Sequence, residues 1–170
     1  MSWRRHGILQ SLMVGAALLL GPLACSTKEA PVDLTKPIDL NKVNMVFTPI
    51  GGVFEGVQVS ADHVTAHGWA RLGDVSGKVD LVLILNQNNE LLAQAAPKGA
   101  REDVGKSSVG PVLATPGFSI AVGIEKLTRT RTTSLAAFSY SVKHNRANRL
   151  ERKWNLVFKD GKITPLRQDE

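Results

Sequence analysis

The residues of this chain that could do chemistry are histidines, scattered carboxylates and a few serines. His63 and His67 stand four positions apart, and on a β-strand this spacing puts both side chains on one face about 13 Å apart. Two imidazoles at that distance are too far apart to bind one metal ion. No serine lies in a Gly-x-Ser-x-Gly sequence, the usual setting of a hydrolase nucleophile. We therefore predict a protein that is not an enzyme and that holds neither a metal nor a cofactor.

The carboxylates fall mostly at predicted turns, where such side chains usually bond nearby backbone groups. These residues are Asp62, Asp74, Asp80, Asp103 and Asp160. A carboxylate pair that hydrolyses a glycan has to lie about 5–9.5 Å apart, a separation that depends on the fold. A hydrolase is therefore kept as the least favoured alternative.

Cys25 is the only cysteine, so an exported form of the chain has no intrachain disulfide to make. It ends a segment in which Arg4 and Arg5 precede an apolar run over residues 8–20. The run has about 13 residues, within the 7–15 of a signal-peptide core and short of the roughly 20 that span a bilayer. The position of Cys25 therefore indicates a thiol that is chemically used.

This layout resembles the signal peptide of a bacterial lipoprotein, although Pro22 and Leu23 replace the usual leucine and small residue of that pattern. The resemblance implies that residues 1–24 are removed and that Cys25 is lipidated. Two or three acyl chains would anchor the protein firmly to a membrane. Ser26, in place of an aspartate, favours the outer membrane over the inner one. We expect a cell-envelope protein that faces the periplasm or the cell surface.

Three regions are expected: a signal peptide over 1–24, the lipidated cysteine and a flexible tether over 25–44, and one folded domain over 45–170. Pro31 and Pro37 interrupt the second region, and no periodicity is sustained there. A first edge strand over Val32–Leu40 is the alternative, because its apolar residues partly alternate with polar ones.

The folded part is predicted to be all-β, because apolar residues recur with period two in short runs between Gly, Asn, Asp and Pro. Asp160-Gly161 is the strongest hairpin signal in the chain. Such spacing favours an antiparallel β-sandwich of about seven or eight strands. The predicted strands are Val53–Val59, Val64–Leu72, Val79–Leu85, Leu91–Ala95, Phe118–Ile124, Leu135–Val142, Trp154–Phe158 and Lys162–Leu166.

Three short motifs, Gly68-Trp69-Ala70, Arg101-Glu102-Asp103-Val104 and Gly117-Phe118, resemble those of a small immunoglobulin-like β-sandwich module of bacterial envelope proteins. Such modules accompany glycosyltransferase and methyltransferase domains. The resemblance implies that Arg101 and Asp103 brace the long loop through a charge-assisted hydrogen bond. No catalytic domain accompanies the motifs here.

Basic residues crowd the connections between the later strands and predict one basic end of the domain. They are Arg129, Arg131, Lys143, Arg146, Arg149, Arg152 and Lys153. Such a cluster suits anionic lipid, lipopolysaccharide, an anionic glycan or an acidic envelope protein, whereas export argues against nucleic acid. The alternative interpretation is that these residues form a solvated loop whose charges only keep the protein soluble.

We therefore expect a binding or structural domain that presents a basic face to an anionic envelope component. The alternative is a glycan-binding accessory module for a separate envelope enzyme. Trp69 and Trp154 each fall within an alternating strand, so both are predicted as core residues rather than as a sugar-stacking platform.

Overall fold

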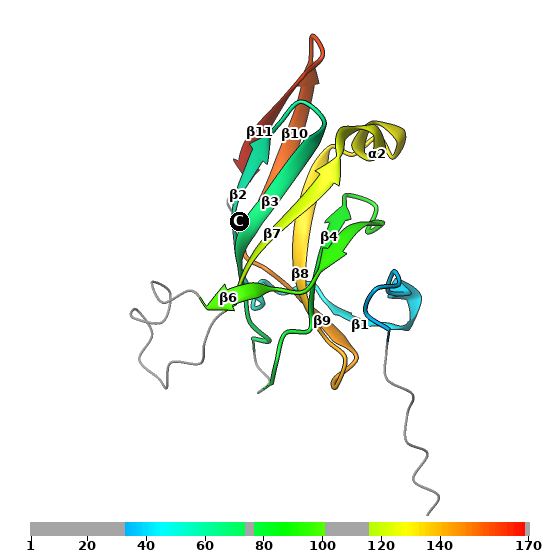
Figure 1. The fold of residues 1–170 in the computed structure, drawn as a ribbon, viewed down its shortest axis with the longest axis vertical. Coiled ribbons are helices and arrows are strands. Elements are labelled where there is room, and N and C mark those ends of the chain that lie inside the picture. The colour runs from blue at the N-terminus through cyan, green and yellow to red at the C-terminus, as the bar shows by residue number, and fades with distance from the viewer. Residues whose placement is uncertain (1–32, 74–76, 101–115, 169–170) are drawn as a thin grey trace, which may run out of the picture. The chain divides into compact units, whose positions relative to one another are not determined.

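Alternating apolar residues build the strands of two β-sheets (Figure 1). The computed structural model describes residues 33–73, 77–100 and 116–168. All eight predicted strands are present, with ends within about two residues of the expected ones. They are β2 (Gly52–Val59), β3 (His63–Ala70), β4 (Leu81–Asn86), β5 (Leu91–Ala95), β7 (Pro116–Gly123), β8 (Ser134–Ser141), β10 (Lys153–Lys159) and β11 (Lys162–Gln168).

Five short elements were not predicted. They are the 3-10 helix η1 (Leu40–Lys42), strands β1 (Asn44–Val46), β6 (Lys98–Ala100) and β9 (Arg146–Arg149), and the helix α2 (Ile124–Arg129). Each has three to six residues, too few to establish a periodic pattern. Cys25, Arg101 and Asp103 lie outside the described residues, so their predicted roles stay predictions.

The two sheets have different sizes and pair mostly antiparallel strands. The small sheet has the order β2-β3-β7-β6, and the large sheet has seven strands centred on β8. Along one edge β8 pairs with β4, which in turn pairs with β5. Its other edge is shared by β9 near Phe138–Ser141 and by β10 near Ser134–Leu135. The described residues therefore form an all-β sandwich, as predicted.

Gly51 and Gly52 join the two sheets where they meet. Gly51 donates to the carbonyl oxygen of Arg149 at 2.7 Å, and Glu151 donates to that of Gly52 at 2.8 Å. Gly52 has a φ of +116°, and a Cβ there would collide with the carbonyl oxygen of Trp69. Glycine is required at this joint because an L side chain fits neither the dihedral nor the space.

The main core fills the space between the sheets, and a second apolar cluster lies on the outer face of the large sheet. β4 contributes to both, since Val82 and Ile84 face the main core while Leu81, Leu83 and Leu85 belong to the outer cluster. All six residues of β4 are buried. An uninterrupted apolar run is what a strand covered on both faces requires.

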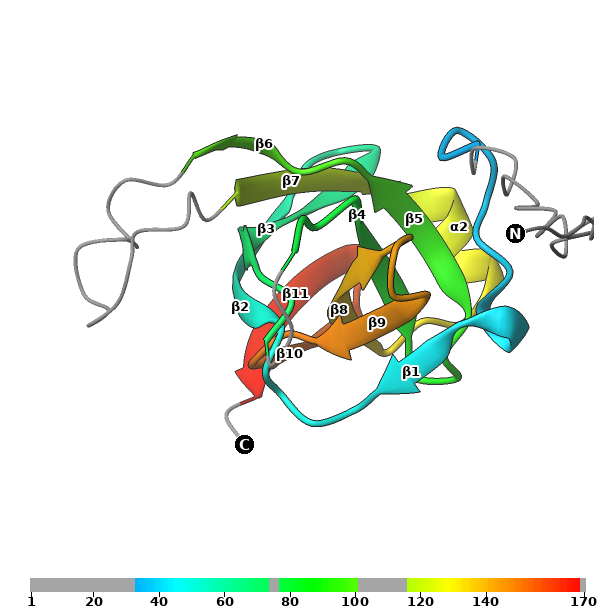
Figure 2. The ribbon, with the colours of Figure 1, turned by 90° about the horizontal axis from the view of Figure 1, so that it is seen from below.

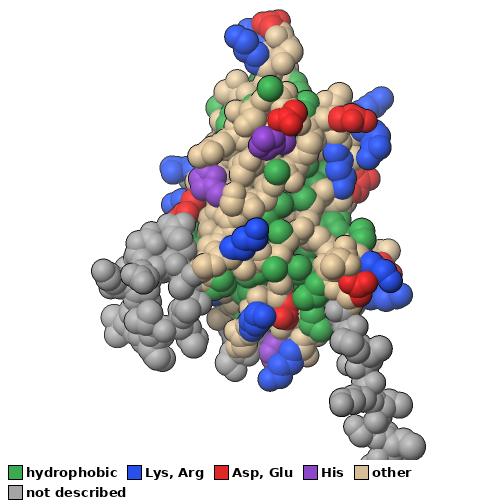
Figure 3. Space-filling view, viewed as in Figure 1, with side chains coloured by type: hydrophobic (Ala, Val, Ile, Leu, Met, Phe, Trp, Pro, Cys, Tyr) green, Lys and Arg blue, Asp and Glu red, His purple; other side chains and the backbone are tan. Residues whose placement is uncertain are grey.

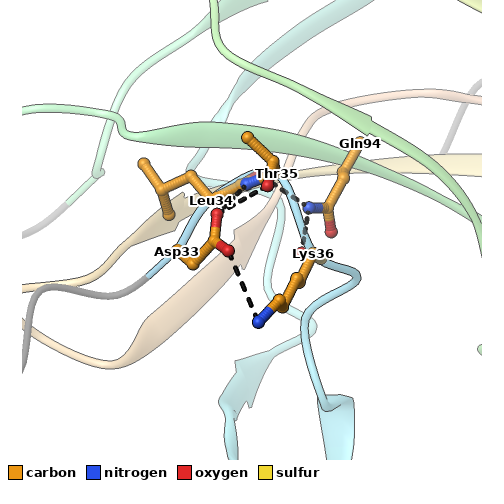
Figure 4. Close-up of polar contacts among 5 residues, drawn as sticks. All are labelled: Asp33, Leu34, Thr35, Lys36 and Gln94. Atoms are coloured by element: carbon orange, nitrogen blue, oxygen red, sulfur yellow. Dashed lines mark hydrogen bonds and ion pairs between the residues drawn. The ribbon is translucent and has the colours of Figure 1, made fainter.

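Residues 33–46 cover the outer cluster, and we call this segment the strap. Leu34, Ile38, Leu40, Val43 and Met45 pack against the outer cluster. The side-chain amide of Gln94 on β5 holds the strap by three hydrogen bonds to its backbone, two of them within the turn drawn in Figure 4. The expected tether over 25–44 is therefore wrong for residues 33–44, which are folded because they bury apolar side chains. Residues 33–44 belong to the same compact unit as the rest of the domain, so the domain does not begin at residue 45. The 3-10 helix η1, rather than an edge strand, contains Leu40, the last residue of the alternative strand.

Candidate anion-binding groove

The seven predicted basic residues do not gather at one end of the domain. Arg129 ends α2 and Arg131 lies in the turn before β8. Lys143 and Arg146 follow the far end of β8. A strand of eight residues spans roughly 25 Å. The expected single basic end is therefore wrong, because the length of β8 separates the two groups.

Arg149 and Lys153 are brought together instead, on the outer face of the large sheet. Arg149 ends β9 and lies opposite Phe138 of β8. Lys153 begins β10, whose next residue Trp154 lies opposite Leu135, so Lys153 stands beside Ala136. Both cations thus flank the same outward stretch of β8. Figure 2 shows β9 and β10 converging beside β8.

These two cations line one open groove with a volume of about 170 Å³. The groove is lined by Phe47, Asn86, Gln87, Asn89, Ser134, Ala136, Phe138, Arg149, Lys153 and Gln168. Two of these residues are cations and none is acidic. The described lining of the groove therefore combines two cations with amide, hydroxyl and aromatic groups.

The floor of the groove is aromatic. Phe47 follows the strap and meets Phe138 edge to face, with ring centroids 5.7 Å apart and planes at 86°. Phe138 is buried, whereas Phe47 remains 49% exposed. This floor excludes water from one side of any group that binds there, which strengthens electrostatic attraction to the cations.

One wall of the groove is the β4–β5 loop, and its amides are fixed by the protein itself. The side-chain oxygen of Asn86 accepts hydrogen bonds from the backbone of Asn88 and Glu90, both at 2.9 Å. Gln87 donates to the carbonyl oxygen of Arg131 and accepts from the backbone of Thr133, both at 3.0 Å. The loop is thereby tied to the segment before β8, so this wall is rigid.

The charge of Arg149 determines what the groove can bind. Its side chain is only 9% exposed, which places a guanidinium in a poorly hydrated setting. A guanidinium presents a planar fork of donors that matches a carboxylate or a phosphate in a bidentate arrangement. Lys153 adds a second positive charge, which suits an anionic group more than a neutral one.

The sequence pointed to Arg149 and Lys153 but missed the other groove residues. Phe47, Ser134 and Gln168 come from three distant segments, and only strand register brings them together. The polar run Asn86–Asn89 between two predicted strands is typical of a hairpin loop, and it is the one sequence signal for this part of the groove. Arg152 is half-buried with a φ of +67° and does not line the groove.

A second polar surface lies on the outer face of the small sheet. His63, Thr65, His67 and Trp69 alternate outward along β3, and histidines are visible on this face in Figure 3. His63 bonds the carboxylate of Asp62 at 2.6 Å, and this bond lowers the pKa of that carboxyl. Within the described ranges, no group of three or more His, Cys, Asp or Glu side chains is arranged to hold a metal ion.

The two tryptophans differ in their surroundings. Trp154 packs against the main core, and its indole donates to the carbonyl oxygen of Phe54 at 3.2 Å, as predicted for a core residue. Trp69 belongs to neither apolar cluster, and the guanidinium carbon of Arg71 lies 5.7 Å from its ring centroid. The prediction that Trp69 is a core residue is therefore wrong, because its position in β3 directs it to the outer face.

Comparison with known proteins finds no matching family model, no matching curated protein and no matching solved structure. The immunoglobulin-like kinship of the folded part therefore stays a prediction. Among the described residues, no helix is long and apolar enough to cross a bilayer.

Proposed function

We propose that this chain is a lipid-anchored protein of the bacterial cell envelope whose folded part binds an anionic group in the Arg149–Lys153 groove. It acts by binding rather than by catalysis. The anionic group is a carboxylate or phosphate carried by an envelope component. The observation that carries the proposal is the convergence of a nearly buried arginine and a lysine on one groove, whose described lining residues include no acidic side chain.

The folded strap supports this proposal by shortening the link to the anchor. Asp33 follows Cys25 by only eight positions, which span at most about 29 Å when fully extended. A lipidated Cys25 would therefore hold the folded unit close to the membrane surface. Phosphate and carboxylate groups are concentrated there, which is where such a groove is useful.

Binding in the groove is tested by titrating residues 32–170, which form a compact unit with their own core, with inorganic phosphate and with an oligosaccharide that contains a uronic acid. We expect changes in the amide NMR spectrum to concentrate at Arg149, Lys153 and Gln168. The variant Lys153→Gln should weaken binding about tenfold, the effect of losing one charge-assisted hydrogen bond.

The matched control for this titration is Lys98→Gln, which removes the same charge from β6 on the small sheet. The groove assignment is contradicted if the spectral changes scatter over the whole surface. It is also contradicted if Lys98→Gln weakens binding as much as Lys153→Gln does, because net charge alone would then account for the effect.

The anchor is tested separately by measuring the mass of the N-terminal peptide from the mature, detergent-extracted protein. A peptide that begins at Cys25 and carries acyl chains supports the lipoprotein assignment. An unmodified peptide that begins at another residue contradicts the lipid anchor and the membrane location, whereas the proposed anion binding in the groove is unaffected.

The outward-facing, half-buried position of Trp69 favours a second candidate function, a glycan-binding accessory module for a separate envelope enzyme. Its ring lies on the outer face of the small sheet beside polar side chains, and sugars stack on such rings. Neutral oligosaccharide should then shift the indole resonance of Trp69, but not that of Trp154, and the shift should persist at high salt. If Trp69→Ala binds the oligosaccharide unchanged, this function is excluded for that face.

A further inference from the structure

The β10–β11 hairpin has one face that is mostly exposed, with only Lys153 and Asn155 half-buried. Lys153 pairs with Gln168, Asn155 with Leu166, Val157 with Thr164, and Lys159 with Lys162. Paired residues of antiparallel strands point to the same side, so these eight side chains share one face, which we call the hairpin face. Trp154, Leu156 and Ile163, on the opposite side, contact the main core.

The hairpin face exposes large apolar side chains. Val157 is 42% exposed and Leu166 is 51% exposed. Phe47, at 49%, lies in the adjoining groove, which Lys153 and Gln168 also line. Phe158, near the tip on the opposite side, is also exposed, at 44%. The hairpin therefore exposes apolar side chains on both faces, and exposed apolar residues that lie close together mark an interaction surface.

The same face is basic. Three of its eight residues are lysines, Lys153, Lys159 and Lys162, and none is acidic. Asp160 lies in the turn at the tip, where it and Gly161 have φ values of +49° and +72°. These dihedrals match a two-residue hairpin turn, so Lys159 and Lys162 are brought next to each other at a tight tip. Figure 1 shows the hairpin extending past the end of the β2–β3 hairpin.

We propose that the hairpin face docks on an anionic lipid bilayer. Lys159 and Lys162 meet the lipid phosphates, and Val157 and Leu166 enter the boundary between headgroups and acyl chains. Lysine stems reach along apolar surface while their charged ends stay hydrated, as docking at this depth requires. The pattern of basic and apolar side chains on one face is typical of surfaces that lie on membranes.

The size of the face favours a bilayer over an acidic protein. Two strands of seven residues present roughly 25 Å by 10 Å, or about 250 Å². A stable protein interface buries about 800 Å² on each partner. A bilayer surface has no such requirement, because a few inserted side chains act together with the charges. The inference rests on the proposed lipid anchor at Cys25, which would keep the hairpin close to a membrane.

Docking is tested with residues 32–170, which lack the anchor, by sedimentation with vesicles of phosphatidylcholine alone or mixed with phosphatidylglycerol. We expect the fragment to sediment with the anionic vesicles only, and less at high salt. Lys159→Glu with Lys162→Glu should lower partitioning about 30-fold or more, since each lysine near an anionic surface contributes about fivefold and the introduced negative charges are also repelled. Val157→Ser with Leu166→Ser, which keeps every charge, should lower it about tenfold.

The matched control is Lys78→Glu with Lys98→Glu, two exposed lysines outside the hairpin that give the same change in net charge. The inference is overturned if the wild-type fragment does not sediment with anionic vesicles, in which case an acidic protein becomes the occupant to test. It is also overturned if the control variant loses as much binding as the hairpin variant, or if the serine variant sediments like wild type.

Failure of docking is distinguishable from failure of the groove. The hairpin variants leave Arg149 and Lys153 in place, so they should still bind inorganic phosphate with unchanged spectral shifts. Conversely, Lys153→Gln should lose phosphate binding, while its sedimentation with anionic vesicles should fall only by the amount expected for the loss of one positive charge. That result would show that the groove and the hairpin face are separate sites.

Discussion

The side-chain nitrogen of Gln94 donates to the carbonyl oxygen of Lys36 at 2.7 Å, across 58 positions of sequence. The same amide donates to Leu34 at 3.1 Å and accepts from the backbone of Ile38 at 3.0 Å. One side chain of β5 thus satisfies three backbone groups of the strap, and Figure 4 shows its bonds to Leu34 and Lys36. Segments without strand partners need such bonds, because unpaired backbone groups are costly to bury.

Replacing Gln94 by alanine should release the strap. Three hydrogen bonds contribute about 0.5–1.5 kcal/mol each, and partial hydration of the released groups reduces the loss. We expect the free energy of unfolding to fall by about 1–3 kcal/mol in urea titrations, with faster hydrogen exchange at the Ile38 amide. Gln58→Ala, an exposed site on β2, should change neither quantity. Equal effects of the two variants would show that Gln94 does not hold the strap.

The strap should also loosen in acid. Hydrogen bonds from the Thr35 side chain and backbone lower the pKa of Asp33, and the backbone amide of Asn41 lowers that of Asp39. A lowered pKa in the fold means that the stabilisation is present above the ordinary value, about 3.9, and is lost as pH falls through the folded value. Hydrogen exchange of strap amides should accelerate below about pH 4, and less so in Asp39→Asn. Identical pH profiles in wild type and variant would contradict this.

Tyr140 should ionise at unusually high pH. Burial raises its pKa, and the negative charge of Asp80 raises it further. Tyr140 is the only tyrosine, so the ultraviolet absorbance of tyrosinate reports on it alone. Because the folded pKa is raised, the neutral ring stabilises the fold below about pH 10, and this contribution is lost as pH rises through the folded value.

Asp80→Asn provides the control for this titration. It removes the charge but keeps a carbonyl oxygen able to accept the backbone hydrogen bond from Val142. The titration midpoint of Tyr140 should move down toward the ordinary value without reaching it, since burial remains. A midpoint at the ordinary value in the wild-type protein would show that the ring is hydrated.

Gly52→Ala should weaken the joint between the sheets. The added Cβ meets backbone atoms of Trp69 and Ala70 and must adopt a φ of +116°, so we expect a loss of about 2 kcal/mol or more in the free energy of unfolding. Gly123→Ala is the control, because its φ is −62° and no atom lies within 4 Å of the new Cβ. Thermal denaturation of both variants checks the difference, and similar losses would contradict a special role for Gly52.

The eight longer strands could be predicted because most of them bury one face, so that apolar residues alternate, while β4 is a continuous apolar run between turn residues. β9 could not, since Arg146 and Arg149 flank Ala147 and Asn148, and a buried asparagine looks like a loop residue in sequence. Asn148 is tolerated inside because its amide donates to the carbonyl oxygen of Leu72 at 2.7 Å. That bond joins residues 76 positions apart, and no local pattern reveals it.

The strap and the groove were missed for a related reason. Pro37 and the irregular spacing of Leu34, Ile38 and Leu40 are typical of a tether. The unbroken apolar run Leu81–Leu85 is typical of a strand covered on both faces, which requires that some other segment covers its outer face. Which segment does so, and which side chains border the groove, depend on register between distant strands.

The burial of β4 on both faces has a consequence for how the chain is made. The stretch Leu81–Leu85 is apolar, uncharged and free of proline, the composition of segments that nucleate aggregation when uncovered. The strap precedes it in the chain, so during synthesis the cover for its outer face emerges first. A truncation that removes the strap would leave the β-sandwich with an exposed apolar cluster on the outer face of the large sheet. We expect such a truncated protein to aggregate and precipitate, rather than to stay in solution with weaker binding.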